Sequence, residues 1–170
     1  RYIMIYLDNS ATTKPCAEAV EAMTAALTEH WGNPSALYGF GIEAAKKLRT
    51  ARMQVAAAMG AEPDRVFFTS GGTEADNWAI FSTIKRFGKR GKHIITTAIE
   101  HHAVLHTCQW LEKQGFDITY LPVDEYGRVT AAQVEKALRE DTILVSVMAA
   151  NNEVGTIQPI GEIGALCREH

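Results

Sequence analysis

The sequence has 170 residues and a mass of 18.7 kDa, and 46% of its residues are hydrophobic, 22% charged and 8% aromatic. This composition is typical of one globular domain and excludes a disordered or fibrous chain. Lysine and arginine number 17 against 20 aspartate and glutamate residues, so the net charge is −3 at pH 7. The chain therefore lacks the excess positive charge of a nucleic-acid-binding protein, and no nucleic-acid partner is expected.

Sequence features also bear on where the protein works. The longest apolar runs are far shorter than the roughly 20 residues of a membrane-spanning helix, so no membrane partner is expected. The start, from Arg1 to Tyr6, has no long apolar stretch and no small-residue cleavage site, so we expect no secretory signal. Cys16, Cys108 and Cys167 form no CxxC pair, which favours a reducing compartment and predicts no metal site. The cytoplasm is the expected location.

Two helices are predicted in the first part of the chain. One follows Pro15, and its apolar face is formed by Val20, Met23, Leu27 and Trp31. The other begins near Gly41, and Gly60 is expected to end it.

After these helices, short β-branched or aromatic runs alternate with helical patterns. The predicted strands are 66–69, 94–97, 118–121 and 143–148, and the predicted helices are 73–87, 102–114, 131–138 and one from residue 160. Thr130 and Gln133 fit a capping box at the start of the 131–138 helix. This alternation predicts an α/β fold in which βαβ units form a mainly parallel sheet. The last helix has no stop signal, which predicts that the chain continues.

Three segments that follow predicted strands carry groups able to bind a ligand. In the first, Gly71, Gly72 and Thr73 open a helix, where free N–H groups and the helix dipole favour a phosphate. The alternative is a tight turn with Thr73 as N-cap residue. In the second, His101 and His102 are placed to stack on a ring or move a proton, or else to cap the next helix.

The third segment is Asn151-Asn152-Glu153-Val154-Gly155, whose amide groups can orient a ligand, although a polar turn has the same composition. Since the carboxyl ends of parallel strands meet at one edge, one pocket can hold all three segments. Together they fit a phosphorylated aromatic cofactor. The remaining histidines have no clustered partner and are predicted at the surface: His30, His93, His106 and His170.

These segments and two earlier ones resemble the cysteine desulfurases, pyridoxal-phosphate enzymes of the class V aminotransferase group. The motifs are Tyr6-Leu7-Asp8-Asn9-Ser10-Ala11-Thr12-Thr13, Trp31-Gly32-Asn33-Pro34-Ser35, Phe68-Thr69-Ser70-Gly71-Gly72-Thr73-Glu74, Glu100-His101 and Asn151-Asn152-Glu153-Val154-Gly155. Five motifs in the family order cover nearly the whole chain.

The resemblance implies a role for four residues. Gly72 and Thr73 would hold the phosphate of pyridoxal 5'-phosphate, His101 would stack on the pyridine ring and assist proton transfer, and Asn152 would contact the cofactor hydroxyl or the substrate. It also implies a homodimer that converts L-cysteine to L-alanine through an aldimine, with the sulfur passing to an enzyme cysteine as a persulfide and then to an acceptor protein.

Several family elements are absent from this sequence: the aldimine lysine, the Asp and Gln near the pyridine ring, the sulfur-accepting cysteine loop and the arginine for the substrate carboxylate. The resemblance also predicts that residues 1–14 belong to the small domain. It predicts that 15–170 form the first part of a fold type I large domain, incomplete at its C-terminal end.

Without the aldimine lysine, the chain alone is expected to be inactive. Its sheet is expected to need the remainder of the polypeptide, because three strands from the absent part would separate 66–69 from 142–148. Selenocysteine lyase, transaminase or a non-catalytic phosphate-binding fragment are the alternatives.

Overall fold

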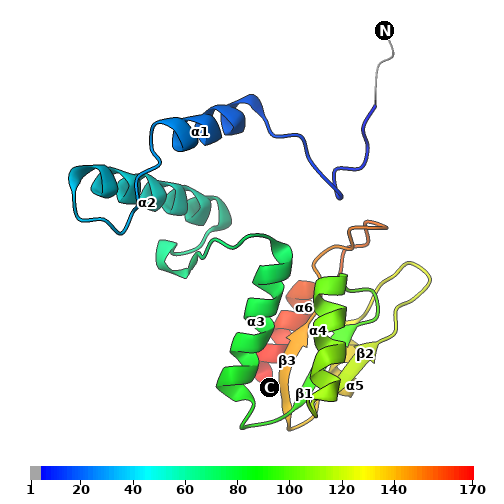
Figure 1. Ribbon diagram of the computed structural model, residues 1–170. Helices are drawn as coiled ribbons and strands as arrows, with labels where there is room; N and C mark the ends of the chain where they lie inside the picture. Colours follow the sequence, from blue (N-terminus) through cyan, green and yellow to red (C-terminus); the bar gives the residue numbers. More distant parts are fainter. Residues whose placement is uncertain (1–4) are drawn as a thin grey trace. The chain divides into compact units, whose positions relative to one another are not determined.

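The computed structural model describes residues 5–170 (Figure 1). The chain forms two compact units, and the boundary between them in the sequence lies between Phe68 and Thr69. The interpretation of the first four residues as free of a secretory signal therefore lies outside the described part. Among residues 5–170, no helix combines the length and the apolar character needed to cross a membrane.

The first unit contains two α-helices and a short 3₁₀ helix. Helix α1 spans Ala17–Thr28, α2 spans Gly39–Met59, and η1 spans Pro63–Arg65. Gly60 ends α2 in the left-handed conformation with φ of 64°, as predicted from its position. Trp31 lies beyond the end of α1, where its ring packs edge-on against Phe40 at a centroid distance of 5.0 Å.

The second unit is built on a parallel sheet. Its helices are α3 (Gly72–Phe87), α4 (His102–Lys113), α5 (Ala131–Ala137) and α6 (Ile160–Glu169). Its strands are β1 (His93–Thr97), β2 (Asp117–Leu121) and β3 (Thr142–Ser146), in the order β2-β1-β3. Both neighbours run parallel to β1, which confirms the predicted βαβ units. The capping box predicted at Thr130 and Gln133 is also present.

Apolar helices cover both faces of this sheet (Figure 1). Ile94 points to one face, where it packs with Ile80 of α3 and with Val104 of α4. Ile95, the next residue of β1, points to the other face and packs with Val134 of α5 and Ile163 of α6. Since successive side chains of a strand alternate, β1 is buried along its whole length, and its carboxyl end lies between the layers.

The strand predicted at 66–69 is wrong for this structure. These residues form no strand, and the sheet of the described residues consists of β2, β1 and β3. Val66, Phe67 and Phe68 have high β-propensity, but a strand exists only where a neighbour accepts and donates its backbone hydrogen bonds.

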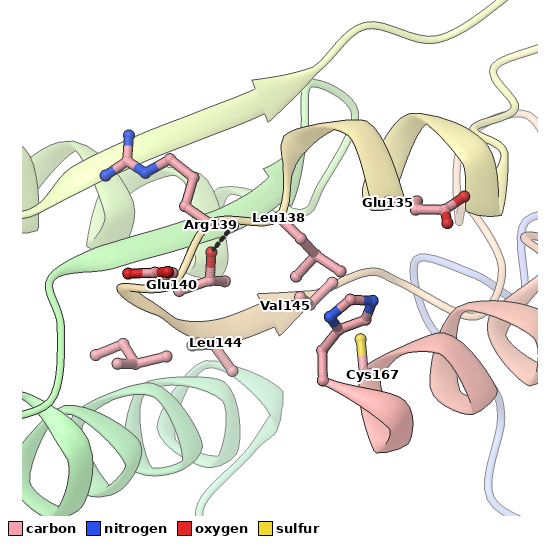
Figure 2. A pocket seen from close by; sticks show the side chains of 10 residues that line it. Glu135, Leu138, Arg139, Glu140, Leu144, Val145 and Cys167 are labelled. Carbon is pink, nitrogen blue, oxygen red and sulfur yellow. Dashed lines mark hydrogen bonds between the residues drawn. The ribbon is translucent and has the colours of Figure 1, made fainter.

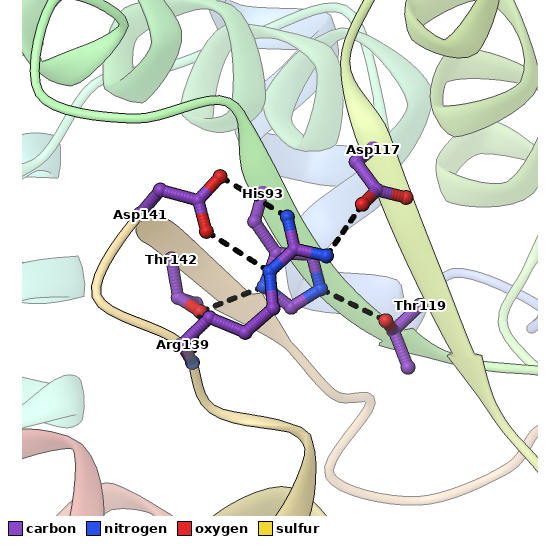
Figure 3. Close-up of polar contacts among 6 residues, drawn as sticks. All are labelled: His93, Asp117, Thr119, Arg139, Asp141 and Thr142. Carbon is purple, nitrogen blue, oxygen red and sulfur yellow. Dashed lines mark hydrogen bonds and ion pairs between the residues drawn. The ribbon is translucent and has the colours of Figure 1, made fainter.

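The surface position predicted for His93 is also wrong. This residue begins β1 and has no exposed area. Its Nδ1 lies 2.7 Å from the hydroxyl of Thr142 and its Nε2 lies 2.8 Å from that of Thr119, so both ring nitrogens are satisfied by adjacent strands (Figure 3). Burial of a histidine is tolerated because these hydroxyls can donate or accept as the tautomer requires.

Charged groups surround the same end of the sheet. Arg139 makes ion pairs with Asp117 and Asp141 beside the His93 ring (Figure 3). Burial lowers the pKa of His93, Arg139 lowers it further, and the two aspartates oppose the shift. His93 is therefore held in its neutral form.

The neutral state of His93 predicts a pH dependence of stability. Because the pKa in the unfolded chain is about 6.5 and the folded pKa is lower, the unfolded state binds more protons between the two values. Stability is complete above about pH 6.5 and falls as the pH decreases toward the folded pKa. Urea unfolding at pH values from 8 to 5 should show this loss in the free energy of unfolding. His93→Gln should reduce the slope of that free energy against pH. His106→Gln is the control on an exposed ring, and an equal slope in H93Q and the native chain would contradict the assignment.

Candidate functional site

The N-terminus of α3 is open to solvent and accessible to an anion. The helix begins at Gly72, and its N-cap residue is Gly71, which has no side chain to occupy the first N–H groups. Thr73 lies inside the first turn and is exposed, so the alternative in which Thr73 is the N-cap residue is wrong.

Space around the two glycines favours the phosphate interpretation. Apart from the adjacent residues and the nearby backbone of α3, no described atom lies within 4 Å of the position that a Cβ on Gly71 or Gly72 would take. The carboxylate of Glu74, the nearest acidic group in the sequence, is turned back onto Ser70, whose N–H and hydroxyl donate to it at 2.6 Å and 2.7 Å. These donors lower the pKa of Glu74.

His101 caps α4 and keeps one ring nitrogen free of that task. Its Nδ1 accepts a hydrogen bond from the N–H of Ala103 at 3.1 Å. This contact assigns the proton of the neutral ring to Nε2. Capping and ligand contact were opposed interpretations of His101, but the structure makes them compatible because each uses a different nitrogen. The adjacent His102 instead stacks on His106, with centroids 4.9 Å apart.

Glu100 is a buried carboxylate that sequence reasoning assigned no task of its own. It is 7% exposed, and its Oε1 accepts hydrogen bonds from the N–H of Met148 and the hydroxyl of Thr97, both at 2.8 Å. Burial raises the pKa of Glu100, while these two hydrogen bonds oppose the shift. The carboxylate thereby connects the loop after β1 to the segment after β3.

Asn151 has the same connecting task. Its Nδ2 donates to the carbonyl of Ile99 at 3.1 Å, and its Oδ1 accepts from the N–H groups of Glu153 and Val154, both at 2.9 Å. Its neighbour Asn152 is exposed at the turn of the same small hairpin, with its Nδ2 3.1 Å from the carboxylate of Glu153. The amide of Asn152 is thus accessible to a ligand, whereas that of Asn151 is not.

These loops form one cavity at the carboxyl end of the sheet. It has a volume of about 360 Å³, and its lining includes His101, Asn152, Glu100, Asn151 and Gly127. The structure thus brings two of the four predicted site residues together. Gly72 and Thr73 do not line this cavity, but Asn77 of α3 connects their helix turn to α4 by donating to the carbonyl of Ala103 at 3.4 Å.

A second hollow, of about 530 Å³, lies between β3, the loop after α5 and the end of α6 (Figure 2). It contains none of the predicted site residues. Within residues 5–170, β3 pairs with β1 alone, so backbone groups at its other edge are available for another strand. Burial raises the pKa of Cys167 here and that of Cys108 to about 11, so the thiolate form of Cys108 is scarce at neutral pH.

The structural contacts of Glu100, Asn77 and Asn151 were not predicted, although Asn151 belongs to a segment whose amides were expected to orient a ligand. The sequence offered only proximity as a sign: each of these residues lies next to, or one helical turn from, a residue predicted to bind the ligand. Their partners are backbone groups far away in sequence, and only the fold reveals them.

Comparison with known proteins shows the family of the chain. The family described as class-V aminotransferase matches residues 5–170. A protein of Methanosarcina thermophila named cysteine desulfurase IscS is 55% identical over 166 residues, which are 98% of this chain and 41% of the relative. The putative cysteine desulfurase IscS 1 of Bacillus subtilis is 57% identical over 166 residues, 98% of this chain and 44% of the relative.

Solved structures support the same family. A NifS-like protein superposes with a TM-score of 0.94 at 44% identity, over 98% of this chain and 46% of that one. SspA in complex with cysteine superposes with a TM-score of 0.91 at 40% identity, over 97% of this chain and 48% of that one. The fold is therefore part of a fold type I large domain, as predicted, and the chain spans less than half the length of these relatives. The chain belongs to the class-V aminotransferase family, and the relatives that it matches there include cysteine desulfurases.

Proposed function

We propose that this chain is the N-terminal part of a pyridoxal-phosphate-dependent cysteine desulfurase. The observation that carries the proposal is the cavity lined by His101 and Asn152 at the carboxyl end of the sheet, beside a helix with an open N-terminus. The substrate would be L-cysteine, with L-alanine as product and the sulfur passed to an acceptor protein. The working unit would be a cytoplasmic homodimer.

The residues present fit the phosphate group of the cofactor. The N–H groups of Gly72 and Thr73 belong to the first turn of α3, where the helix dipole favours an anion, and the exposed hydroxyl of Thr73 is a further donor. The open space over Gly71 and Gly72 leaves room for phosphate oxygens to approach the backbone. Bound pyridoxal phosphate supplies an electron sink for the negative charge that develops on the substrate.

His101 and Asn152 would orient the ring of the cofactor. The imidazole of His101 is held by its cap contact, so its flat face is fixed and its Nε2–H remains available to donate a hydrogen bond. The amide of Asn152 offers both a donor and an acceptor without adding charge. Glu100 and Asn151 hold the two loops in place and thereby fix the distance between these side chains.

The remaining chemistry would come from polypeptide beyond these residues. The lysine that holds the cofactor, the sulfur-accepting cysteine and the groups that bind the substrate carboxylate would lie there. In this proposal residues 1–14 belong to the small domain, 15–170 begin the large domain, and the free edge of β3 receives a strand of the absent part.

The first experiment compares this chain with a polypeptide extended to the full length of its relatives. Each is incubated with pyridoxal phosphate and reduced with borohydride to fix the cofactor covalently. The mass of the intact polypeptide is then measured by mass spectrometry. We expect a cofactor adduct and alanine formation from cysteine for the extended polypeptide, and neither for residues 1–170. An extended polypeptide without an adduct would refute the proposal. Formation of alanine from selenocysteine but not from cysteine would indicate a selenocysteine lyase.

A second experiment, on the extended polypeptide, distinguishes the structural role of Asn151 from the proposed ligand contact of Asn152. Asn151→Ala leaves the Ile99 carbonyl and two N–H groups without their partner, so it should lower the free energy of unfolding by about 2–3 kcal/mol. Asn152→Ala should change stability by less than about 0.5 kcal/mol, because its side chain is exposed.

The same N152A variant should bind pyridoxal phosphate about tenfold more weakly through loss of one hydrogen bond. Urea denaturation and equilibrium dialysis provide the two measurements. Unchanged cofactor affinity in N152A would remove Asn152 from the cofactor site.

A further inference from the structure

One side chain, Asn77, contacts both helices whose N-termini carry the candidate ligands. Its Nδ2 donates to the carbonyl of Thr73 at 2.8 Å, one turn earlier in α3, and lies 3.4 Å from the carbonyl of Ala103 in the first turn of α4. Its Oδ1 accepts from the hydroxyl of Thr107 at 2.8 Å. The amide group is therefore bonded on both sides, within α3 and across to α4.

The carbonyls of Thr73 and Ala103 fix which way the amide faces. The hydroxyl of Thr107 is also 2.8 Å from the carbonyl of Ala103, so its single proton is shared between this carbonyl and Oδ1 of Asn77. Rotating the amide would set its oxygen against the carbonyls of Thr73 and Ala103, and the NH₂ group is thus held toward them. Thr107 is itself 8% exposed, so the network is partly buried.

The rest of the described α3–α4 contact is packing of apolar and aromatic side chains. Ile80 of α3 packs with Val104, Cys108 and Leu111 of α4 around Ile94, and further along the two helices the ring of Phe81 lies edge-on to that of Trp110 at a centroid distance of 5.6 Å. Apolar packing is non-directional, whereas hydrogen bonds depend on distance and angle. Asn77 therefore supplies a hydrogen-bonded contact that ties the first turn of α3 to the first turn of α4.

The backbone partners of Asn77 belong to the residues that matter most for the proposed function. Thr73 would bind the cofactor phosphate, and the N–H of Ala103 donates to Nδ1 of His101. We propose that Asn77 is a positioning residue that holds the phosphate-binding turn of α3 at a fixed distance from the ring of His101. This inference rests on the proposed function, and it assigns Asn77 no contact with the cofactor itself.

The test uses the extended polypeptide and the variants Asn77→Ser, Asn77→Ala and Thr107→Val. A serine at this position keeps the hydrogen bond to the carbonyl of Thr73 but is too short to reach α4. N77S therefore removes only the contacts of this side chain with Ala103 and Thr107, which we call the bridge. Thr83→Ala is the matched control, because Thr83 makes the same hydrogen bond within α3, to Ala79, at 2.9 Å.

Two measurements are made on each variant. Equilibrium dialysis gives the dissociation constant for pyridoxal phosphate, which we expect to rise about tenfold in N77S and N77A and less in T107V. Hydrogen exchange of the cofactor-free polypeptide gives the protection of the first turn of α4, where the N–H groups of Val104 and Leu105 donate to the carbonyl of His101. Exchange there should be about fivefold faster in N77S than in T83A.

Each outcome decides the inference. Equal values for N77S and T83A in both measurements would overturn it, and so would a loss confined to N77A, since that result assigns the effect to the bond within α3. If N77A does not fold, N77S and T107V still decide. Failure of the proposed function is distinguishable, because the native polypeptide would then not bind pyridoxal phosphate, while the exchange measurement would still report on the bridge.

Discussion

Strand β1 is buried on both faces and has a strand on each side, and this burial constrains the chemistry of every residue near its ends. Burial favours hydrogen bonds within the protein for polar groups placed there, although the hydroxyl of Thr96 has none among the described residues. His93 finds them at the start of the strand in the hydroxyls of Thr119 and Thr142. Glu100 finds them after its end in Thr97 and Met148. The position of the cavity follows from this second set of contacts.

The candidate site shows the same division of tasks twice. In the pair Glu100 and His101, the first side chain is buried and bonded to the fold, and the second is exposed and available. In the pair Asn151 and Asn152, the order is the same. The buried member supports a neighbouring residue that we propose contacts a ligand, so a loop can present polar groups from a fixed backbone. Two adjacent residues of similar chemistry can therefore have unrelated tasks.

Much of the second unit could be predicted from the sequence, because hydrophobic periodicity and capping are local signals. Strands β1, β2 and β3 and the helices between them lie where the patterns placed them, and the capping box at Thr130 is present. The errors concern properties that depend on distant partners. Residues 66–69 have the composition of a strand but form none in this structure, and the buried ring of His93 is bonded to Thr119 and Thr142 of other strands. Asn151 has the composition of a turn residue, and only its bond to Ile99 reveals its structural task.

The cysteines differ enough in environment to serve as reporters of motion. Cys16 is exposed, whereas Cys108 has no exposed area and lies on α4, the helix that His101 caps. The pKa of Cys108 is raised to about 11, so at neutral pH its thiolate is scarce as well as shielded. A thiol reagent therefore reacts with Cys108 only when α4 moves away from the sheet. The rate at which Cys108 is modified therefore measures how often α4, the helix that His101 caps, separates from the sheet.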